Sequence, residues 1–325
     1  MIVEETIRAV RVFATGGTIA MAGRHAVPTL DADQLVSEIS ALTGIELQTE
    51  NPMSLPGSHL SLGDALALAR LAIAAADAGE GIVVTQGTDT LEEVAFLCDL
   101  LYGGRLPIVF TGAMRPATAV GSDGPANILD AVAVASSPKA DDLGVVVSFA
   151  GRIHAARSVR KTDSVEVAAF ASPHGEVGRV VEGRVTIDRQ PPRRPPLTPE
   201  SLDYSVEIIS AGLGSDGAVV GTLLGGDLDG LIAVGLGAGH FPPRLLRQLS
   251  VAAERIPVVA TVRPERGAIL HDTYGFEASE RDLRRTPIIP AGLLSPAAAR
   301  IKLLACLGAG LSGAEIREAF AVDDG

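Results

Sequence analysis

Short apolar runs alternate with longer Ala- and Leu-rich stretches along the first half of the chain. Four runs rich in β-branched or aliphatic residues are predicted to be strands, at residues 8–14, 81–85, 107–111 and 144–150. The longer stretches are predicted to be helices, at residues 31–42, 62–78, 90–102 and 122–136. Strands that are apolar throughout and separated by helices indicate a parallel sheet covered on both faces. The expected fold class is therefore α/β.

A proline-rich segment divides the chain into two expected domains. Residues 189–203 contain five prolines, and proline disfavours both helix and sheet pairing because it fixes φ and lacks an N–H donor. We expect a linker there, between an N-terminal domain of residues 1–188 and a C-terminal α/β domain of residues 204–325. In the second domain the pattern predicts strands at 206–210, 231–236 and 257–262, and helices at 245–255, 296–307 and 313–320.

Charge and composition limit the partners. The chain has 39 acidic and 27 basic residues, with a formal net charge of −12 at pH 7, and it lacks a dense Lys/Arg stripe, so nucleic acid is not an expected partner. Charged residues precede any apolar stretch at the N-terminus, which argues against a secretory signal. The longest apolar window, residues 65–76, contains Arg70 and is too short to cross a bilayer. We expect a cytoplasmic protein with no membrane partner.

The His and Cys patterns do not predict a metal site. The six histidines lack the spacing of HxxxH or HExxH, and Cys98 and Cys306 each lie in an apolar run that predicts a reduced core residue. A glycine-rich run at residues 235–239 is followed by His240 where a dinucleotide-binding motif has its third glycine. Neither a metal nor a cofactor is expected.

Candidate chemistry follows two of the predicted strands. The first strand leads into Thr-Gly-Gly-Thr at residues 15–18, and the strand at 81–85 leads into Gly-Thr-Asp at residues 87–89. Ligands bind outside the carboxyl ends of parallel strands, and glycine lets a backbone approach them closely. Asp89 could hold an ammonium group, or it could only favour a helix N-terminus. The threonine hydroxyls could equally serve only to bind backbone groups.

Three further features surround these turns. Thr90 and Glu93 have the spacing of a capping box, which predicts a structural role for Thr90. Gly112 and Ala113 follow the strand at 107–111 and could present main-chain groups to a ligand, although ordinary loop geometry explains them equally well. Lys161 could lower the pKa of a threonine hydroxyl or carry its proton if it lies in the same crevice, although a single lysine is more commonly a solvated surface group.

Taken together, the motifs at residues 15–20 (Thr-Gly-Gly-Thr-Ile-Ala) and 87–91 (Gly-Thr-Asp-Thr-Leu) resemble those of the bacterial-type L-asparaginase/glutaminase family. The resemblance continues in the family's order through residues 112–116, 123–127, 161–162 and 235–239. It implies a larger N-terminal flavodoxin-like parallel-sheet domain with a smaller C-terminal α/β domain. It also implies a homodimer or homotetramer that hydrolyses L-asparagine to L-aspartate and ammonia without a cofactor.

The resemblance assigns roles by motif position. Thr18 would be the nucleophile that forms an acyl ester with the substrate, and Thr88, Asp89 and Lys161 would form a second catalytic cluster. Ser58 and Asp89 would hold the α-carboxylate and α-amino groups of the substrate. The implied substrate-binding residues are Gly17, Gly57, Ser58, Gly87, Thr88, Asp89 and Ala113.

The chain departs from the family pattern at several positions. The loop at residues 21–30 lacks the tyrosine that helps to activate the nucleophile in this family; His25 in that loop, or Tyr274 from another segment or subunit, could replace it. Gln86 stands where the family usually has a histidine. His240 stands where many relatives offer an asparagine, and Glu280 loosely matches a glutamate that relatives contribute to the neighbouring subunit.

Several functional alternatives stay open at this level. The enzyme could prefer L-glutamine, or it could be a subunit of a tRNA-linked amidotransferase. Such a subunit normally has an extra N-terminal module, whereas this chain reaches its first predicted strand at residue 8. Because the loop tyrosine is missing, a weakly active amino-acid-binding or sensor protein is the alternative from a different class.

Overall fold

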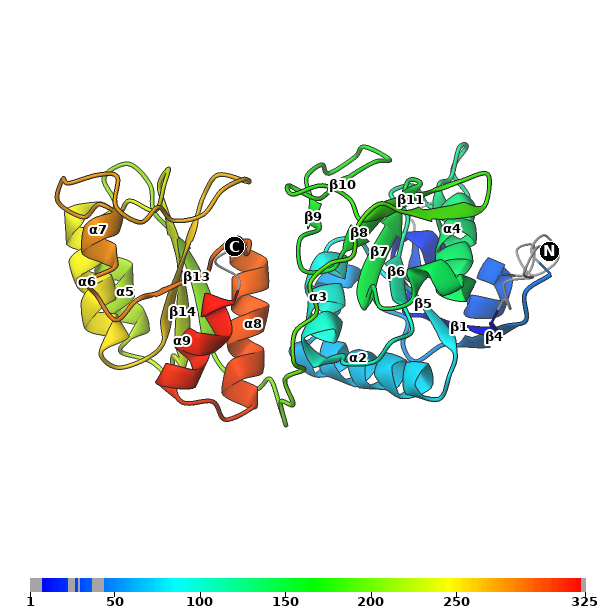
Figure 1. The fold of residues 1–325 in the computed structure, drawn as a ribbon, viewed down its shortest axis with the longest axis horizontal. Coiled ribbons are helices and arrows are strands. Elements are labelled where there is room, and N and C mark those ends of the chain that lie inside the picture. Colours follow the sequence, from blue (N-terminus) through cyan, green and yellow to red (C-terminus); the bar gives the residue numbers. More distant parts are fainter. Residues whose placement is uncertain (1–7, 23–26, 29, 37–43, 323–325) are drawn as a thin grey trace. The chain divides into compact units, whose positions relative to one another are not determined.

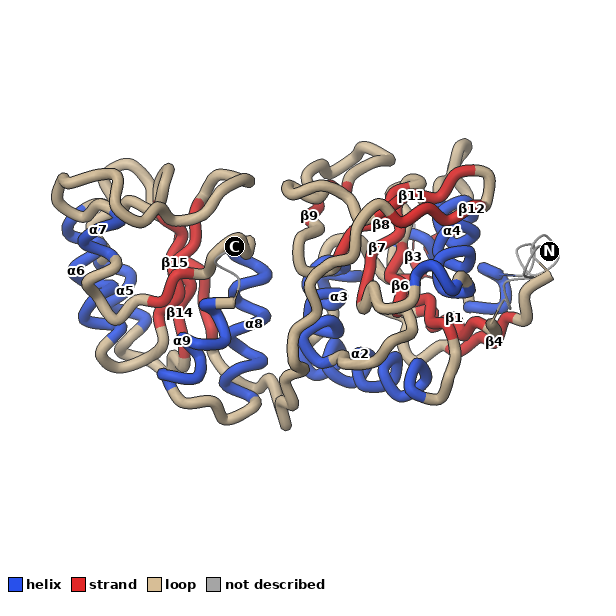
Figure 2. The backbone as a smooth tube through the Cα atoms, viewed as in Figure 1, coloured by secondary structure: helices blue, strands red, loops and turns tan. Residues whose placement is uncertain are grey.

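The computed structural model describes residues 8–22, 27–28, 30–36 and 44–322. The chain forms two compact units, residues 1–196 and residues 197–325, and the division falls inside the proline-rich segment. Each unit contains a sheet that is parallel at least in part, with helices packed against it (Figures 1 and 2). The predicted fold class, a larger α/β domain with a parallel-rich sheet followed by a smaller α/β domain, is confirmed.

The first unit is built on a sheet of eight strands in the order β12-β11-β8-β7-β6-β5-β1-β4. Its parallel part consists of β1 (Val10–Ala14), β4 (Leu47–Glu50), β5 (Gly81–Thr85), β6 (Ile108–Thr111) and β7 (Val145–Phe149). An antiparallel extension, which the pattern did not predict, consists of β8 (Arg152–Ala155), β11 (Gly178–Val181) and β12 (Arg184–Ile187). These strands have only four residues each, and each of them includes an exposed arginine.

Helices cover both faces of this sheet. On one face α2 (Leu62–Asp77) and α3 (Leu91–Leu101) pack together, and α4 (Gly124–Ser136) shares a core with Val83 and Val109 on the other (Figure 1). The β5–α3–β6 and β6–α4–β7 connections move in the same direction across the sheet but use opposite faces. They therefore have opposite hands, so one of them departs from the right-handed connection found in ~98% of such units.

Short elements complete the first unit. Residues 32–36 are helical, and the strands β9 (Arg160–Lys161) and β10 (Phe170–Ala171) form a separate two-stranded antiparallel sheet. The remaining short elements are β2 (Met21–Ala22), β3 (Val27–Pro28) and the 3₁₀ turns η1 (Thr18–Ala20), η2 (Gly57–His59) and η3 (Pro138–Ala140).

The second unit is a four-stranded parallel sheet between two helical layers. The strands β13 (Val206–Ser210), β14 (Gly230–Gly235), β15 (Val258–Val262) and β16 (Ile289–Pro290) follow one another in order across the sheet. The helices α5 (Ala218–Leu223) and α6 (Pro243–Ala253) lie together on one face. On the other face lie α8 (Pro296–Gly308) and, packed against it, α9 (Gly313–Ala321) (Figure 1). A short helix, α7 (Glu280–Leu283), precedes β16.

Side chains fix the start of several helices, although not at α3. Ser61 and Asp64 form a reciprocal capping box at the start of α2. The capping box predicted for Thr90 and Glu93 is wrong, because the side chain of Thr90 caps nothing. Its Oγ1 instead donates a hydrogen bond of 2.9 Å to the carbonyl oxygen of Gly57. A distant segment thus competes successfully for this hydroxyl.

A buried histidine lies on β8 in the first unit. The side chain of His154 is fully buried, its Nδ1 lies 2.9 Å from Oγ of Ser172, and its Nε2 has no hydrogen-bond partner. Burial lowers the pKa of His154 to about 4, although the negative charge of Glu176 acts in the opposite direction. The imidazole ring is therefore neutral near pH 7.

This histidine predicts an acid-sensitive first unit. The unfolded chain takes up a proton at His154 near pH 6.5, whereas the folded chain does so only near pH 4, so stability falls as the pH decreases between these values. The loss reaches about 3 kcal/mol in the free energy of unfolding. Urea denaturation of the wild type and of His154→Gln over this range should show a shallower decline in the variant. Parallel declines would contradict the assignment.

Candidate active site

Three glycines bring three distant segments of the first unit into direct contact. A methyl group at Gly17 would lie 2.3 Å from Cα of Gly87, and one at Gly87 would lie 2.7 Å from the backbone nitrogen of Gly57. Both distances are too short for any side chain, so these backbones touch because the residues are glycines. Gly17 also has a φ of +75°, which other residues rarely adopt.

Each of these glycines is followed by a residue with a hydroxyl group. Thr18 follows Gly17 at the carboxyl end of β1, Ser58 lies in η2, and Thr88 follows Gly87 just after β5. Thr18 is half-buried, Ser58 is exposed and Thr88 is 5% exposed. The glycine contact therefore gathers three hydroxyl-bearing residues at the carboxyl edge of the parallel sheet, where such sheets bind ligands.

Hydrogen bonds hold the turn after β1 in place. The backbone nitrogen and Oγ1 of Thr15 both donate to the carbonyl oxygen of Thr85, at 3.0 and 2.9 Å. The nitrogen of Gly17 donates to the carbonyl oxygen of Leu55, whose own nitrogen donates to Thr15. Because these bonds link β1 to β5 and to the segment before η2, the turn that carries Thr18 is tied to both neighbouring segments.

A lysine joins the two polar residues that follow β5. Nζ of Lys161 lies 2.9 Å from Oγ1 of Thr88 and 3.1 Å from Oδ1 of Asp89. The Lys161 side chain is 20% exposed and that of Asp89 is 63% exposed, so the ion pair contributes little to stability. Its consequence is geometric, because it orients both the hydroxyl of Thr88 and the carboxylate of Asp89.

An Asp–Asn pair at the start of α4 organises the loop after β6. The carboxylate of Asp123 accepts hydrogen bonds of 2.9 Å from the backbone nitrogens of Met114 and Arg115. Nδ2 of Asn127 donates to the carbonyl oxygen of Gly112 at 2.9 Å. The sequence pattern predicts a helix from residue 122 but does not by itself predict this role of Asp123 and Asn127. The signal for this role is the spacing of four, which places both side chains on one face of the first helical turn.

This loop packs directly behind Thr88. A methyl group at Gly112 would lie 2.6 Å from the carbonyl oxygen of Gln86 and 3.2 Å from Cγ2 of Thr88. The neighbouring Ala113 is fully buried. The backbone that follows β6 therefore supports the Thr88 side, and the predicted residues Ala113 and Thr88 belong to one packed region.

The other predicted residues belong to the second unit or lie outside the described residues. His25 lies outside the described residues. His240, Tyr274 and Glu280 meet one another within the second unit, where the ring centroids of His240 and Tyr274 are 4.9 Å apart. Nε2 of His240 lies 3.3 Å from Oε2 of Glu280, and Oε1 of Glu280 accepts hydrogen bonds from the nitrogens of Thr273 and Tyr274.

The environment of Glu280 is that of a structural carboxylate. Its side chain is completely buried, and burial favours a raised pKa. The backbone donors of Tyr274 and Thr273 outweigh that effect and hold the pKa of Glu280 below its usual value. The carboxylate thus fixes the loop before α7.

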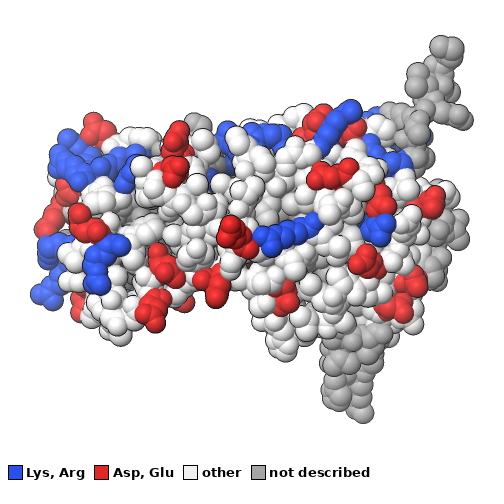
Figure 3. Space-filling view, turned by 90° about the horizontal axis from the view of Figure 1, so that it is seen from below, with Lys and Arg blue, Asp and Glu red and all other residues white. Residues whose placement is uncertain are grey.

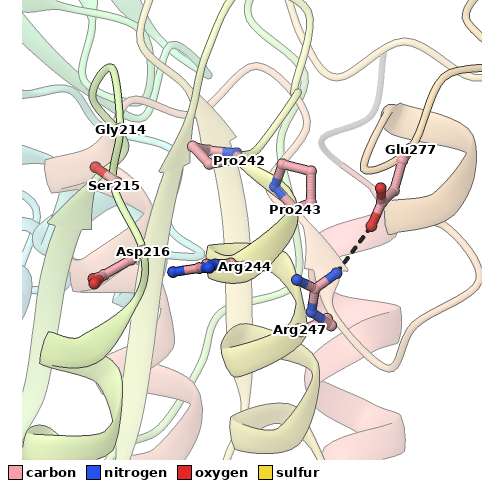
Figure 4. A pocket seen from close by; sticks show the side chains of 8 residues that line it. All are labelled: Gly214, Ser215, Asp216, Pro242, Pro243, Arg244, Arg247 and Glu277. Carbon is pink, nitrogen blue, oxygen red and sulfur yellow. Dashed lines mark hydrogen bonds and ion pairs between the residues drawn. The ribbon is translucent and has the colours of Figure 1, made fainter.

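A separate open pocket lies in the second unit at the start of α6 (Figure 4). Its volume is about 500 Å³, and side chains of both charge signs line it. Arg247 pairs there with Glu277 at 2.9 Å. None of the predicted site residues contributes to this pocket, whose lining consists of Gly214, Ser215, Asp216, Pro242, Pro243, Arg244, Arg247 and Glu277.

The described residues offer neither a metal-binding cluster nor a membrane-spanning helix. Among the described residues, no group of three or more His, Cys, Asp or Glu side chains is arranged to hold a metal ion. Within that part of the chain, no helix has the length and apolarity required to cross a membrane. On the face drawn in Figure 3, Lys and Arg side chains are interspersed with Asp and Glu.

Two family models match the chain over most of its length. The model described as "Asparaginase, N-terminal" matches residues 9–193, and the one described as "Glutaminase/Asparaginase C-terminal domain" matches residues 205–320. Each model falls within one of the two units. Both halves of the chain are therefore related to the same kind of protein.

Individual relatives agree with the family models. A probable L-asparaginase of Deinococcus radiodurans is 37% identical over 94% of this chain and 95% of its own. L-asparaginase 2 of Escherichia coli is 28% identical over 96% of this chain and 92% of its own length. A crystal structure of a probable cytoplasmic L-asparaginase from Campylobacter jejuni superimposes with a TM-score of 0.85 and 27% identity, over 97% of this chain and 99% of that one. The chain belongs to the bacterial-type L-asparaginase/glutaminase family of amidohydrolases.

Proposed function

We propose that this protein hydrolyses L-asparagine to L-aspartate and ammonia, with Thr18 as the nucleophile. The observation that carries the proposal is the hydrogen-bonded cluster of Lys161, Thr88 and Asp89, which the glycine contact joins to the turn of Thr18. The names of the relatives from Deinococcus radiodurans and Escherichia coli support the choice of substrate.

The proposed reaction has two steps. Oγ1 of Thr18 attacks the carbon of the side-chain amide, the C–N bond breaks, and the nitrogen leaves as ammonia with the proton of the hydroxyl group. The product of this step is an ester between Thr18 and the substrate acyl group. Water then attacks the ester, which releases L-aspartate and returns a proton to Thr18.

The surrounding residues would orient the substrate and stabilise charge. The ammonium group of Lys161 donates to Oγ1 of Thr88 and so leaves the proton of that hydroxyl available to another acceptor. Ser58 and Asp89 would hold the α-carboxylate and α-ammonium groups of the substrate, which converts binding energy into orientation. Backbone N–H groups near Thr18, Thr88 and Ala113 would stabilise the oxyanion, and the loss of one such donor costs about 10²–10³ in rate.

The base that activates Thr18 is assigned to one of two residues. His25 belongs to the loop where the family carries its tyrosine, and Tyr274 belongs to the second unit. We propose His25 as the first candidate, because its position in the loop corresponds to that of the missing tyrosine. Histidine also titrates near neutral pH and suits a general base.

L-glutamine is the second candidate substrate. A glutaminase-asparaginase of Pseudomonas fluorescens is 37% identical over 56% of this chain and 53% of its own length. Parallel assays of ammonia release from L-asparagine and L-glutamine decide between the two preferences. Absence of ammonia release from both substrates would favour the amino-acid-binding alternative.

We further propose that the protein is a cytoplasmic homodimer or homotetramer, by analogy with the family.

Removal of one hydroxyl should abolish the activity. Thr18→Ala is expected to lower kcat for ammonia release by at least ~10³-fold, because no oxygen remains to form the ester. Thr18→Ser keeps a hydroxyl and should retain measurable turnover. Both variants should keep the circular dichroism spectrum of the wild type. Near-normal turnover by Thr18→Ala would remove this residue from the mechanism.

A methyl group in the glycine contact should separate the hydroxyls. Gly87→Ala places a Cβ atom 2.7 Å from the nitrogen of Gly57, and a displacement of about 1 Å can lower kcat by ~10²-fold. Gly63→Ala is the matched control, because its Cβ on α2 lies 3.7 Å from the nearest atom, Oγ of Ser61. Steady-state assays should show a loss only for Gly87→Ala. Equal activity of both variants would contradict the role of the contact.

A further inference from the structure

A carboxylate on α3 contacts the segment that carries Lys161. We propose that Glu92 is a positioning residue: by accepting a hydrogen bond from the backbone nitrogen of Lys161, it holds this lysine in register with Thr88 and Asp89. This inference rests on the proposed function for its consequences in catalysis. Its structural part concerns only the position of one amine.

The strand that carries Lys161 is too short to fix the position of this lysine without a hydrogen bond from another element. Lys161 ends β9, which pairs with β10 in a two-stranded sheet separate from the eight-stranded one. The pairing covers only two residues on each strand, with Lys161 opposite Phe170. Isolated two-stranded pairs are marginally stable. A hydrogen bond from outside this small sheet therefore restricts where the lysine can lie.

Glu92 supplies that bond from a rigid element. It lies in the first turn of α3, and its Oε2 accepts the hydrogen bond from the backbone nitrogen of Lys161. The helix is anchored by a run of buried residues, from Val94 to Cys98. The main chain of Lys161 is thereby fixed to the body of the first unit.

The same helix start carries the partners of the lysine side chain. Thr88 and Asp89 precede α3 by less than one helical turn, and Nζ of Lys161 reaches both. Lys161 is thus held at two points on one rigid segment, at its backbone nitrogen by Glu92 and at its Nζ by the other two. Two attachment points fix both the position and the direction of a flexible side chain, which otherwise has many rotamers.

The environment of Glu92 differs from that of a solvated carboxylate at a helix start. The residue is half-buried, and burial raises the pKa of its carboxyl group. The neighbouring Glu93 acts in the same direction, whereas the Lys161 donor and the positive charges of Arg160 and Lys161 oppose it. A carboxylate that only stabilised the helix dipole would be better solvated if it stayed in water. The half-buried position of Glu92 is explained by the hydrogen bond that its Oε2 accepts from the backbone nitrogen of Lys161.

Three variants separate this role from charge and from general stability. Glu92→Ala removes the acceptor, while Glu92→Gln keeps an amide oxygen that can accept the same bond. Glu166→Ala is the control, because it removes an exposed carboxylate from the loop that joins β9 to β10. We expect kcat for ammonia release to fall ~10²-fold in Glu92→Ala, with a smaller change in KM. Glu92→Gln and Glu166→Ala should stay within about threefold of the wild type, because the acceptor is retained in both.

A second readout does not require activity. The chain has three lysines, at positions 139, 161 and 302, so acylation of each amine by a water-soluble reagent can be followed by peptide mass spectrometry. The rate at Lys161 relative to the exposed Lys139 should rise about tenfold in Glu92→Ala, as expected for the loss of one hydrogen bond to a charged group. Glu92→Gln should leave the relative rate unchanged.

The outcomes are distinguishable. Wild-type protein that releases no ammonia would refute the proposed function. The labelling rates would still test whether the hydrogen bond between Glu92 and Lys161 positions the lysine. Active wild type with unchanged kcat and unchanged Lys161 labelling in Glu92→Ala would overturn the inference. It would also be overturned if Glu92→Gln were damaged as strongly as Glu92→Ala, because the charge and not the acceptor would then matter.

Discussion

The contact between the backbones of Gly17, Gly57 and Gly87 is the constraint on which the candidate site depends. No side chain fits between them, since added methyl groups would lie 2.3 and 2.7 Å from neighbouring backbone atoms. The contact is possible because parallel β1 and β5 end at the same edge of the sheet and η2 approaches them there. It brings the residues that follow these glycines, two threonines and a serine, to the same edge of the sheet. The proposed chemistry needs such proximity, because a threonine hydroxyl is a weak nucleophile without neighbouring groups.

Rigid elements hold the segments around these hydroxyl groups. The loop after β6 is fixed by Asp123 and Asn127 at the start of α4, and Lys161 is fixed by contacts to the start of α3. Each of these ties is a hydrogen bond worth little to overall stability. Their combined effect is orientation, which preorganised sites need to keep reacting groups within a few tenths of an ångström. The proline-rich segment separates this arrangement from a second unit with its own core.

Apolar periodicity predicted the elements that are buried on both sides. The strands β1, β5, β6 and β7 and the helices between them were predicted because continuous apolar runs leave little ambiguity. The strands β8, β11 and β12 were not predicted, because four-residue segments that each include an exposed arginine resemble loops. The motifs predicted Thr88, Asp89 and Lys161 as a cluster. The hydrogen-bond partners of Thr90 and Glu92 could not be predicted, because they lie 33 and 69 residues away. Local capping rules gave the wrong partner for Thr90 for the same reason.

The most direct test of the account is whether an acyl group forms on Thr18. Enzyme mixed with L-asparagine, or with a slowly hydrolysed analogue, can be quenched in acid, digested with trypsin and analysed by mass spectrometry. The account predicts that the peptide of residues 12–24 gains the mass of an aspartyl group, and that fragmentation places it on Thr18 and not on Thr15. Turnover with the adduct on another residue, or with no adduct under conditions that trap the ester in a related enzyme, would contradict it.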